Sequence, residues 1–315
     1  MTATRIELSV IIPCYNAGAW VAETIRSVLA QSTPPLEIIA VNDGSTDATA
    51  EILSGFDGRV RVITQTNLGL GAARNAGARV ARGEWLGFLD ADDLYLPDAL
   101  TRYGELHREF PEATVLFADF QEFDSAGTRF RPSASAYLAD AGSIAAKSRN
   151  ACLLFEPPVK VLIERNGAFT PSTLVVRKDV FFRAGQFDET RYMGAEDLDL
   201  YFRLAPTESV GFMNHVVLRK RRHAANMGQD LTLMRAAAEW TLDRAETLYR
   251  EKYRGLLSIV RRKKAGLLGG WVRADLEAGR PGALALSLRL VRCSPLEPQG
   301  WWLLVKTLAR RPFGT

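Results

Sequence analysis

Residues 8–16, LSVIIPCYN, decide the fold of this 315-residue chain. Residues 8–12 form a compact apolar run rich in β-branched side chains, and Pro13 follows at once, so the pattern predicts a buried strand that stops at the proline. A buried strand followed by polar residues is typical of an open α/β sheet, whose ligands bind beyond the carboxyl ends of the strands. Such a sheet requires further strands that alternate with helices.

That alternation is predicted over the first hundred residues. The expected elements are a helix at 18–32, a strand at 36–41, a helix at 46–54, a strand at 60–63, a helix at 71–82, a strand at 84–89 and a helix after Pro97. This order predicts βαβ units, and therefore an α/β fold with a mainly parallel, Rossmann-like sheet flanked by helices. Further along, strands are expected at 113–123 and 172–177 and a helix from about Glu196, while residues 130–170 resist assignment.

The C-terminal part of the chain has a different composition. Residues 251–315 contain thirteen Lys and Arg against four Asp and Glu, so they carry +9 and the preceding residues −5. The pattern is helical from about residue 231, with breaks at 281–282 and 295–298. We therefore predict an α/β domain over residues 5–228 and a C-terminal helical extension over residues 229–315.

Basic residues in this extension lie beside tryptophan and leucine, at 261–272 and again at 301–311. Such a composition favours a helix on the surface of an anionic membrane. The alternative is a pair of helices packed on the first domain with solvated basic faces. The acidic body of the chain, together with the lack of a recognisable binding module, argues against a nucleic-acid partner.

Cysteine content and hydropathy bear on localisation. Cys14, Cys152 and Cys293 are odd in number and widely spaced, which argues against a disulfide framework and against a zinc cluster. Residues 1–7 lack the apolar core of a signal peptide, and no run of about 20 apolar residues occurs. We expect a cytoplasmic protein that associates peripherally with the inner face of the cytoplasmic membrane if its C-terminal helices bind lipid.

Carboxylates gather at the end of the strand predicted at 84–89. Asp90, Asp92 and Asp93 fall within four residues and repel one another unless a cation offsets their charge. Mg²⁺ or Mn²⁺ together with a diphosphate would do so, because these ions use few protein ligands and bind substrate phosphates. An acidic turn that caps the helix after Pro97 is the alternative.

Four other positions carry candidate chemistry. Asp43 lies in NDGSTD, a sequence that also suits a turn and a helix cap. Residues 67–75, NLGLGAARN, contain G-x-G, but Arg74 replaces the third glycine of a dinucleotide site, which favours an arginine facing an anionic ligand. Residues 196–200, EDLDL, open a helix with adjacent carboxylates, for dipole stabilisation or as a general base. His223 is an ordinary histidine unless it lies near the acidic cluster.

Taken in order, these motifs resemble those of the family 2 glycosyltransferases, which have the GT-A fold. The matching segments lie between residue 8 and about residue 225, two-thirds of the chain, and are 9–16 (SVIIPCYN), 42–47 (NDGSTD), 67–75 (NLGLGAARN), 88–93 (FLDADD), 185–189 (GQFDE) and 196–200 (EDLDL) with 203–204 (RL). The resemblance implies an inverting glycosyltransferase that moves a sugar from a nucleotide-sugar donor, expected to be UDP-linked, to a hydroxyl of a glycan or lipid-linked glycan.

The resemblance also implies roles for individual residues. The donor would be bound by Pro13, Tyr15, Asn16, Asp43, Asn67, Arg74, Asp90, Ala91 and Asp92. Among these, Tyr15 would stack on the nucleobase, Asp43 would accept a hydrogen bond from it, and Arg74 would lie near the base and phosphates.

On the reacting side, Asp92 and His223 would bind Mn²⁺ or Mg²⁺, Asp197 would be the general base, and Glu196 and Thr170 would face the acceptor. The chemistry agrees, since an acceptor hydroxyl is a poor nucleophile until a base removes its proton, and a metal offsets the charge of the leaving diphosphate.

Other functions share these features. A glycosyl-phosphate-lipid synthase uses a similar donor on the same fold. A non-catalytic module that binds a sugar nucleotide or glycan would be expected to lack Asp92 or Asp197, and both are present. A nucleotidyltransferase would need a glycine-rich basic loop after the first strand, which residues 15–18, YNAG, do not provide.

Overall fold

The computed structural model describes residues 6–309 except 125, 128–137, 139–144, 166–168, 191–193, 225, 227–229 and 281. The chain divides into two compact units, Met1–Ala238 and Glu239–Thr315.

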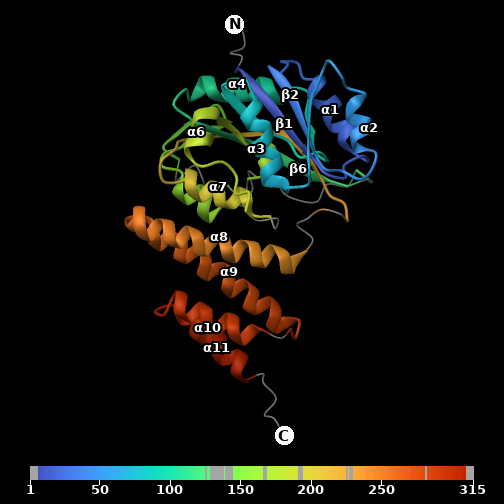
Figure 1. The fold of residues 1–315 in the computed structure, drawn as a ribbon. Coiled ribbons are helices and arrows are strands. Elements are labelled where there is room, and N and C mark those ends of the chain that lie inside the picture. Colours follow the sequence, from blue (N-terminus) through green and yellow to red (C-terminus); the bar gives the residue numbers. More distant parts are fainter. Residues whose placement is uncertain are drawn as a thin grey trace. The chain divides into compact units, whose positions relative to one another are not determined.

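The first unit begins with four parallel strands joined by helices (Figure 1). The strands are β1 (Leu8–Cys14), β2 (Glu37–Asp43), β3 (Arg61–Gln65) and β4 (Trp85–Phe88), in the spatial order β3-β2-β1-β4. The helices between them are α1 (Val21–Leu29), α2 (Thr49–Ser54) and α3 (Leu70–Val80). The alternation predicted from the sequence is confirmed.

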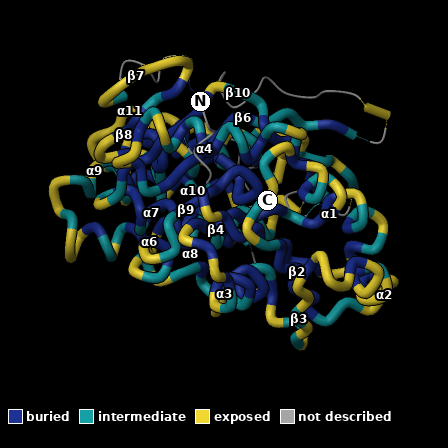
Figure 2. Tube along the Cα trace, turned by 90° about the horizontal axis from the view of Figure 1, so that it is seen from above, coloured by how far each residue is buried: buried dark blue, intermediate teal, exposed yellow. Residues whose placement is uncertain are grey.

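Burial of β1 on both faces explains its apolar composition. Leu8, Val10 and Ile12 share one core cluster with residues of α1 and of α4 (Ala99–Glu109). Ile11 points the other way, toward α3, where a Cβ added to Gly77 would lie 2.5 Å from Ile11 Cγ2. Side chains on both faces of this strand are therefore covered, as a parallel sheet requires. In Figure 2 the central strands are buried, whereas α2 and β7 (Lys147–Arg149) are largely exposed.

The sheet continues beyond β4 with the order β9-β6-β10-β8-β7. These strands are β9 (Val175–Arg177), β6 (Val115–Phe123), β10 (Val210–Arg221), β8 (Cys152–Phe155) and β7, and β5 (Leu94–Tyr95) also pairs with β10. β6 and β10 are parallel, while β9 runs antiparallel to both of its neighbours. The result is a mixed, mostly parallel sheet, with α6 (Lys178–Arg183) and α7 (Glu196–Leu204) following β9.

Two features differ from the sequence prediction. The first strand does not stop at Pro13 but runs on to Cys14. Leu89 N donates to Ile11 O (3.0 Å), so the odd-numbered residues of β1 face β4, and the pairing with β4 ends at Ile11. The missing N–H of Pro13 therefore faces a side without a ladder partner, where proline is tolerated. The second feature is β10, which the sequence analysis did not predict.

The second unit is helical, as predicted. It contains most of α8 (Leu231–Lys252), then α9 (Leu257–Glu277), α10 (Ala283–Cys293) and α11 (Pro298–Ala309). A small core of Leu268, Val272, Leu290 and Leu303 joins the last three helices. Within the described residues, no helix is both long enough and apolar enough to cross a membrane.

Candidate active site

A cleft of about 780 Å³ opens beyond the carboxyl ends of β1, β2 and β4. Nine of the residues to which the resemblance assigns a role line it, namely Pro13, Tyr15, Asn16, Asp43, Asn67, Asp90, Ala91, Asp92 and His223, and Asp93 of the acidic cluster lines it too. Four others, Arg74, Thr170, Glu196 and Asp197, are not part of its lining in the portion of the chain that the structure describes. The fold thus brings most of the predicted site together and places the rest around it.

Tyr15 and Asp43 both line the cleft. The Tyr15 side chain is 51% exposed, so its ring is free to stack on a planar ligand. Asp43 is buried, and its carboxylate accepts hydrogen bonds from Gln65 Nε2 (2.7 Å), Leu68 N (2.9 Å) and Gly69 N (2.9 Å). A carboxylate has about four lone-pair sites, so three are used to hold the loop before α3 and about one remains for a ligand.

The loop after β1 is fixed to the loop after β2 by side-chain hydrogen bonds. Asn16 Oδ1 accepts from Thr46 N (2.8 Å), and Gly18 N donates to Asp47 Oδ2 (2.9 Å). Asn16 itself has a positive φ of 48°, a conformation that asparagine tolerates better than most residues. Asn16 therefore shapes the wall of the cleft through these loops.

Asp92 and His223 also line this cleft and contact each other. Asp92 Oδ2 lies 2.8 Å from His223 Nε2 and accepts a hydrogen bond from Asn226 Nδ2 (3.1 Å). Asn226 Oδ1 in turn accepts from His223 N (2.6 Å), and the Trp20 indole stacks on the imidazole with centroids 4.0 Å apart. Burial raises the pKa of Asp92, and the neighbouring Asp90 adds to the shift.

Lys220 lies among the carboxylates of this cleft. Its Nζ donates to Thr170 Oγ1 (2.9 Å), and burial alone would lower the pKa of Lys220. The negative charges of residues 90–93 and of Asp197 outweigh burial and raise that pKa above its ordinary value. Lys220 therefore stays protonated and offsets part of the negative charge of the cluster.

Arg74 is paired with two carboxylates of the chain and is not part of the cleft lining that the structure describes. Its side chain is 1% exposed, Nη2 donates to Asp90 Oδ1 (2.6 Å), and Nη1 donates to Glu196 Oε1. Its guanidinium also lies 5.2 Å from the ring centroid of Phe187. Burial would raise the pKa of Asp90, but Arg74 and Lys220 hold it below its ordinary value. Arg74 thus orients two carboxylates from behind the cleft.

Asp197 directly follows Glu196 at the start of α7. Its Oδ1 accepts from Leu198 N (2.7 Å), whereas Glu196 beside it is paired with Arg74. Withdrawal from water raises the pKa of Asp197 to about 6, and the charge of Glu196 contributes to the shift. A carboxylate that titrates near neutrality is suited to take up a proton from a substrate hydroxyl.

Asp93 ties distant segments together. It is 1% exposed, its Oδ1 accepts from Arg221 N (2.9 Å), and its Oδ2 accepts from Ser172 Oγ (2.6 Å). Burial raises the pKa of Asp93 to about 8, although Lys220 opposes the shift. The end of β10 is held in this way against the loop that follows β4.

Sequence reasoning missed Trp20, Lys220 and Asn226. Asn226 and Lys220 each lie three residues from His223, so the sequence around the histidine was the available signal. Trp20 carried none, because only the fold brings it beside a histidine some two hundred residues away.

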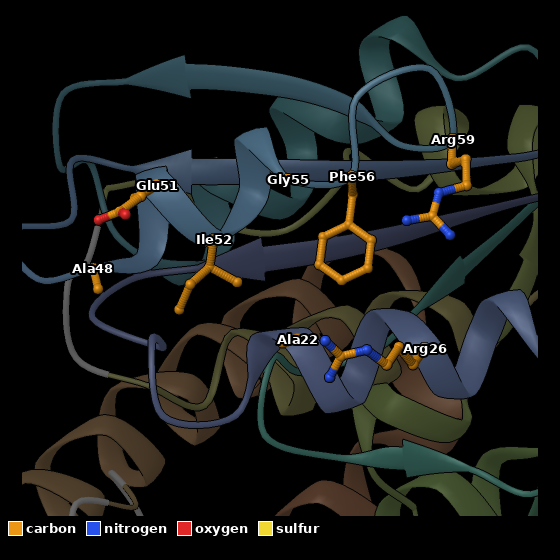
Figure 3. A pocket seen from close by; sticks show the side chains of 8 residues that line it. All are labelled: Ala22, Arg26, Ala48, Glu51, Ile52, Gly55, Phe56 and Arg59. Atoms are coloured by element: carbon orange, nitrogen blue, oxygen red, sulfur yellow. The ribbon is translucent and has the colours of Figure 1, made fainter.

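A second cavity, of about 610 Å³, lies between α1 and α2 (Figure 3). Phe56 lines this cavity, and the guanidinium groups of Arg26 and Arg59 lie 5.8 and 5.4 Å from its ring centroid. None of the residues predicted to act on a substrate lines this cavity. The acidic cleft is therefore the candidate active site.

Known structures identify the class of fold. The structure of S. aureus TarS solved in complex with UDP-GlcNAc is similar with a TM-score of 0.58 and 16% identity, covering 98% of this chain and 93% of that chain. The chain therefore has the GT-A fold of glycosyltransferases, as the motifs predicted.

Sequence comparison identifies the family. The sequence model described as Glycosyl transferase family 2 matches residues 9–165, and the chain belongs to this family. Uncharacterized glycosyltransferases of Rickettsia typhi and Rickettsia prowazekii are each 30% identical over 220 residues, which is 69% of this chain. The match spans 64% of the length of each of these relatives.

Proposed function

We propose that this chain transfers a sugar from a UDP-linked donor to a hydroxyl of a glycan or lipid-linked glycan, with inversion at the anomeric carbon. The observation that carries the proposal is the meeting of Asp92 and His223, 2.8 Å apart, in the cleft that also holds Tyr15 and Asp43. Family membership supports it, as does the UDP-GlcNAc complex of TarS, a protein of the same fold.

The residues present fit a divalent cation. Among the described residues, no three His, Cys, Asp or Glu side chains are grouped to hold a metal ion by themselves. Asp92 Oδ2 and His223 Nε2 nevertheless converge, and His223 Nδ1 is buried without a described hydrogen-bond partner, so a proton can sit there while Nε2 binds a cation. Asp92 and His223 would hold Mn²⁺ or Mg²⁺, ions that need few protein ligands and bind substrate phosphates, and the ion would supply Lewis-acid stabilisation of the leaving diphosphate.

Asp197 is the proposed general base. Its pKa of about 6 leaves it mostly ionised at neutral pH while keeping it basic enough to accept a proton. The neighbouring Glu196 is engaged by Arg74 and is less available for the same task. Removal of the acceptor proton by Asp197 as the oxygen attacks the anomeric carbon gives a single displacement, and a single displacement inverts configuration.

Lys220 and Thr170 support the departing group in this scheme. Lys220 lines the cleft and stays charged, so it adds a positive charge on the side where the diphosphate develops its negative charge. Thr170, expected on the acceptor side, holds the Lys220 ammonium through its hydroxyl. We propose that Thr170 acts through Lys220.

The test is turnover of donor by the purified full chain. UDP-, GDP- and dTDP-sugars are incubated with Mn²⁺, with Mg²⁺ or with EDTA, and the released nucleotide is quantified. We expect slow hydrolysis of one UDP-sugar that requires the metal and is lost in Asp92→Asn. Asp57→Asn, which changes an exposed aspartate in the loop after α2, is the matched control and should turn over normally.

A nucleotide-binding assay distinguishes the outcomes that remain if no donor is hydrolysed. If no donor is hydrolysed but UDP binds the wild type and not Asp43→Ala, the enzyme waits for its acceptor or the cleft serves binding alone. Adding candidate glycan acceptors and determining the anomeric configuration of the product by NMR then decides between these two. Failure of every nucleotide to bind, with or without Mn²⁺, would contradict the proposal.

A further inference from the structure

The last helix of the chain carries apolar side chains on its exposed face. Trp301, Trp302, Val305 and Leu308 of α11 are 49%, 52%, 63% and 49% exposed. Positions 301, 305 and 308 follow the spacing of one helix face, and Trp302 lies beside it. Leu296, just before the helix, is 94% exposed. We call Leu296 and these four α11 residues the apolar face.

The opposite side of α11 already supplies the packing that holds the helix in place. Gly300, Leu303, Leu304 and Thr307 are buried, and Leu303 belongs to the core shared with α9 and α10. A Cβ added to Gly300 would lie 3.4 Å from Leu290, so the two helices are in close contact. The apolar face is therefore additional to what the unit needs for its own core, and an apolar surface of this kind marks an interaction site.

Charge identifies the partner. Residues 298–309 contain one lysine and no acidic residue, and Lys306 Nζ lies 4.0 Å from the ring centroid of Trp302. The whole second unit, residues 239–315, carries fifteen Lys and Arg against seven Asp and Glu, a net charge of +8. A second copy of this unit would bring a like charge to the contact, whereas an anionic lipid surface is complementary to it.

Helix α9 offers less basic and apolar surface to a lipid bilayer than its sequence suggests. The basic run at 261–264 is partly neutralised within the unit, since Arg261 and Lys264 both pair with Glu246. The apolar residues beside that run, Leu268 and Val272, are buried in the helical core. Among the described helices of this unit, α11 carries the group of exposed large apolar side chains, whereas α10 exposes one, Leu288.

We propose that the apolar face of α11 docks on the surface of an anionic bilayer. Trp301 and Trp302 enter the interface between headgroups and acyl chains, where the amphipathic indole ring is favoured, and Lys306 meets lipid phosphates. With 12 residues α11 is shorter than the roughly 20 residues that a spanning helix needs, so it lies on the membrane. This inference stands independently of the chemistry in the cleft.

The experiment is co-sedimentation of the full chain with vesicles of phosphatidylcholine alone or of phosphatidylcholine mixed with phosphatidylglycerol. We expect binding to the anionic vesicles that weakens as salt is raised, because the basic charges are screened. Trp302→Glu combined with Val305→Glu should lower the partition coefficient by about tenfold or more, since both side chains lose their apolar burial. Leu231→Ser, which removes an exposed leucine at the start of α8, should leave it unchanged.

Two measurements keep the outcomes separate. Far-UV circular dichroism verifies that the double variant folds, and donor turnover without vesicles should equal that of the wild type, so loss of vesicle binding is distinct from failure of the active site. The proposal is overturned if the folded wild type ignores anionic vesicles at low salt, or if the double variant binds them equally well. It is also overturned if sedimentation velocity shows self-association through this face in place of lipid binding.

Discussion

Replacing Arg74 with methionine tests how far one buried cation holds the site together. Methionine keeps much of the side-chain length and the contact with Phe187, but it leaves Asp90 and Glu196 without their common partner. Removing one member of a buried ion pair costs about 3–5 kcal/mol. Because the side chains of Asp90 and Glu196 are 24% and 10% exposed, water relieves part of that cost, and we expect the free energy of unfolding to fall by about 3 kcal/mol at pH 7.

The pH dependence gives this prediction a specific signature. In the wild type the pKa of Asp90 is lowered, so its ionised form contributes stability above its unfolded pKa, and that stability is lost as pH falls through the folded pKa. Without Arg74, Lys220 still lowers the pKa of Asp90, but burial is the largest influence, and we expect it to raise that pKa above its unfolded value. Ionisation then costs stability above the unfolded pKa, and acidification removes that cost. The difference between variant and wild type should therefore shrink as pH falls from 7 toward about 4.

The assay is urea unfolding followed by far-UV circular dichroism at both pH values. Arg79→Met is the matched control, since Arg79 lies on the same helix and its pair with Glu189 is 49% and 39% exposed. A surface pair of this kind is worth about 0–1 kcal/mol. A loss in Arg74→Met no larger than that of the control, or one that is the same at both pH values, would refute the reasoning.

Three further predictions concern the cleft. In Asp197→Asn we expect kcat to fall by about 10²–10⁴. The wild-type rate should rise as pH increases through about 6, because Asp197 loses its proton there, and the residual rate of the variant should lack this rise; transfer rates measured from acid to neutral pH check both points. Asp43→Ala leaves the N–H groups of Leu68 and Gly69 without their acceptor, so stability should fall by about 1–3 kcal/mol and UDP affinity with it, as calorimetry can measure. Trp20→Ala should weaken Mn²⁺ binding by about tenfold, because the ring stack that orients the His223 imidazole is lost, whereas Trp20→Phe should retain most of the affinity. Electron paramagnetic resonance of the free ion measures this binding, and unchanged binding in the alanine variant would contradict the role of Trp20.

The sequence was sufficient for the regular part of the fold. The strands predicted at 36–41 and 84–89 contain the runs IIAV (38–41) and WLGFL (85–89), and the helix predicted at 18–32 has an apolar stripe, so local pattern and tertiary packing agree. The prediction that the first strand ends at Pro13 was wrong because proline usually terminates a strand. Here the missing N–H of Pro13 points to the side where pairing with β4 has already ended, so the strand continues to Cys14.

Strand β10 was not predictable in the same way. Its last four residues, LRKR, are largely basic: Lys220 offsets the charge of the cleft carboxylates, and Arg221 Nε donates to the backbone oxygen of Asp92. Its register against β6 also shifts between Met213 and Val216 and again before Leu218. Neither a polar strand end nor a shifted register leaves a period-2 pattern.

Candidate site residues were found by type and order, but their partners were not. Asp92 and His223 are 131 residues apart, and the antiparallel pairing of β5, just after Asp92, with β10, just before His223, brings them within hydrogen-bond distance. For Arg74, the sequence predicted an anionic ligand, and the structure shows the side chain paired with Asp90 and Glu196. Whether that partner is a ligand or the protein's own carboxylates depends on burial, which a single sequence does not give.

The register of β10 also limits where single residues can be inserted or deleted in this chain. Between Met213 and Leu218 the strand advances five residues while β6 advances two, from Ala118 to Phe120, so β10 carries three extra residues, an odd number. Deleting or inserting one residue there would exchange the two faces of everything that follows, and Lys220 would leave the cleft. We expect single-residue insertions to be tolerated in the turn at 294–297 and to abolish activity in residues 214–217. In an insertion scan this short segment would stand out as a gap, although none of its residues touches the substrate in the proposed scheme.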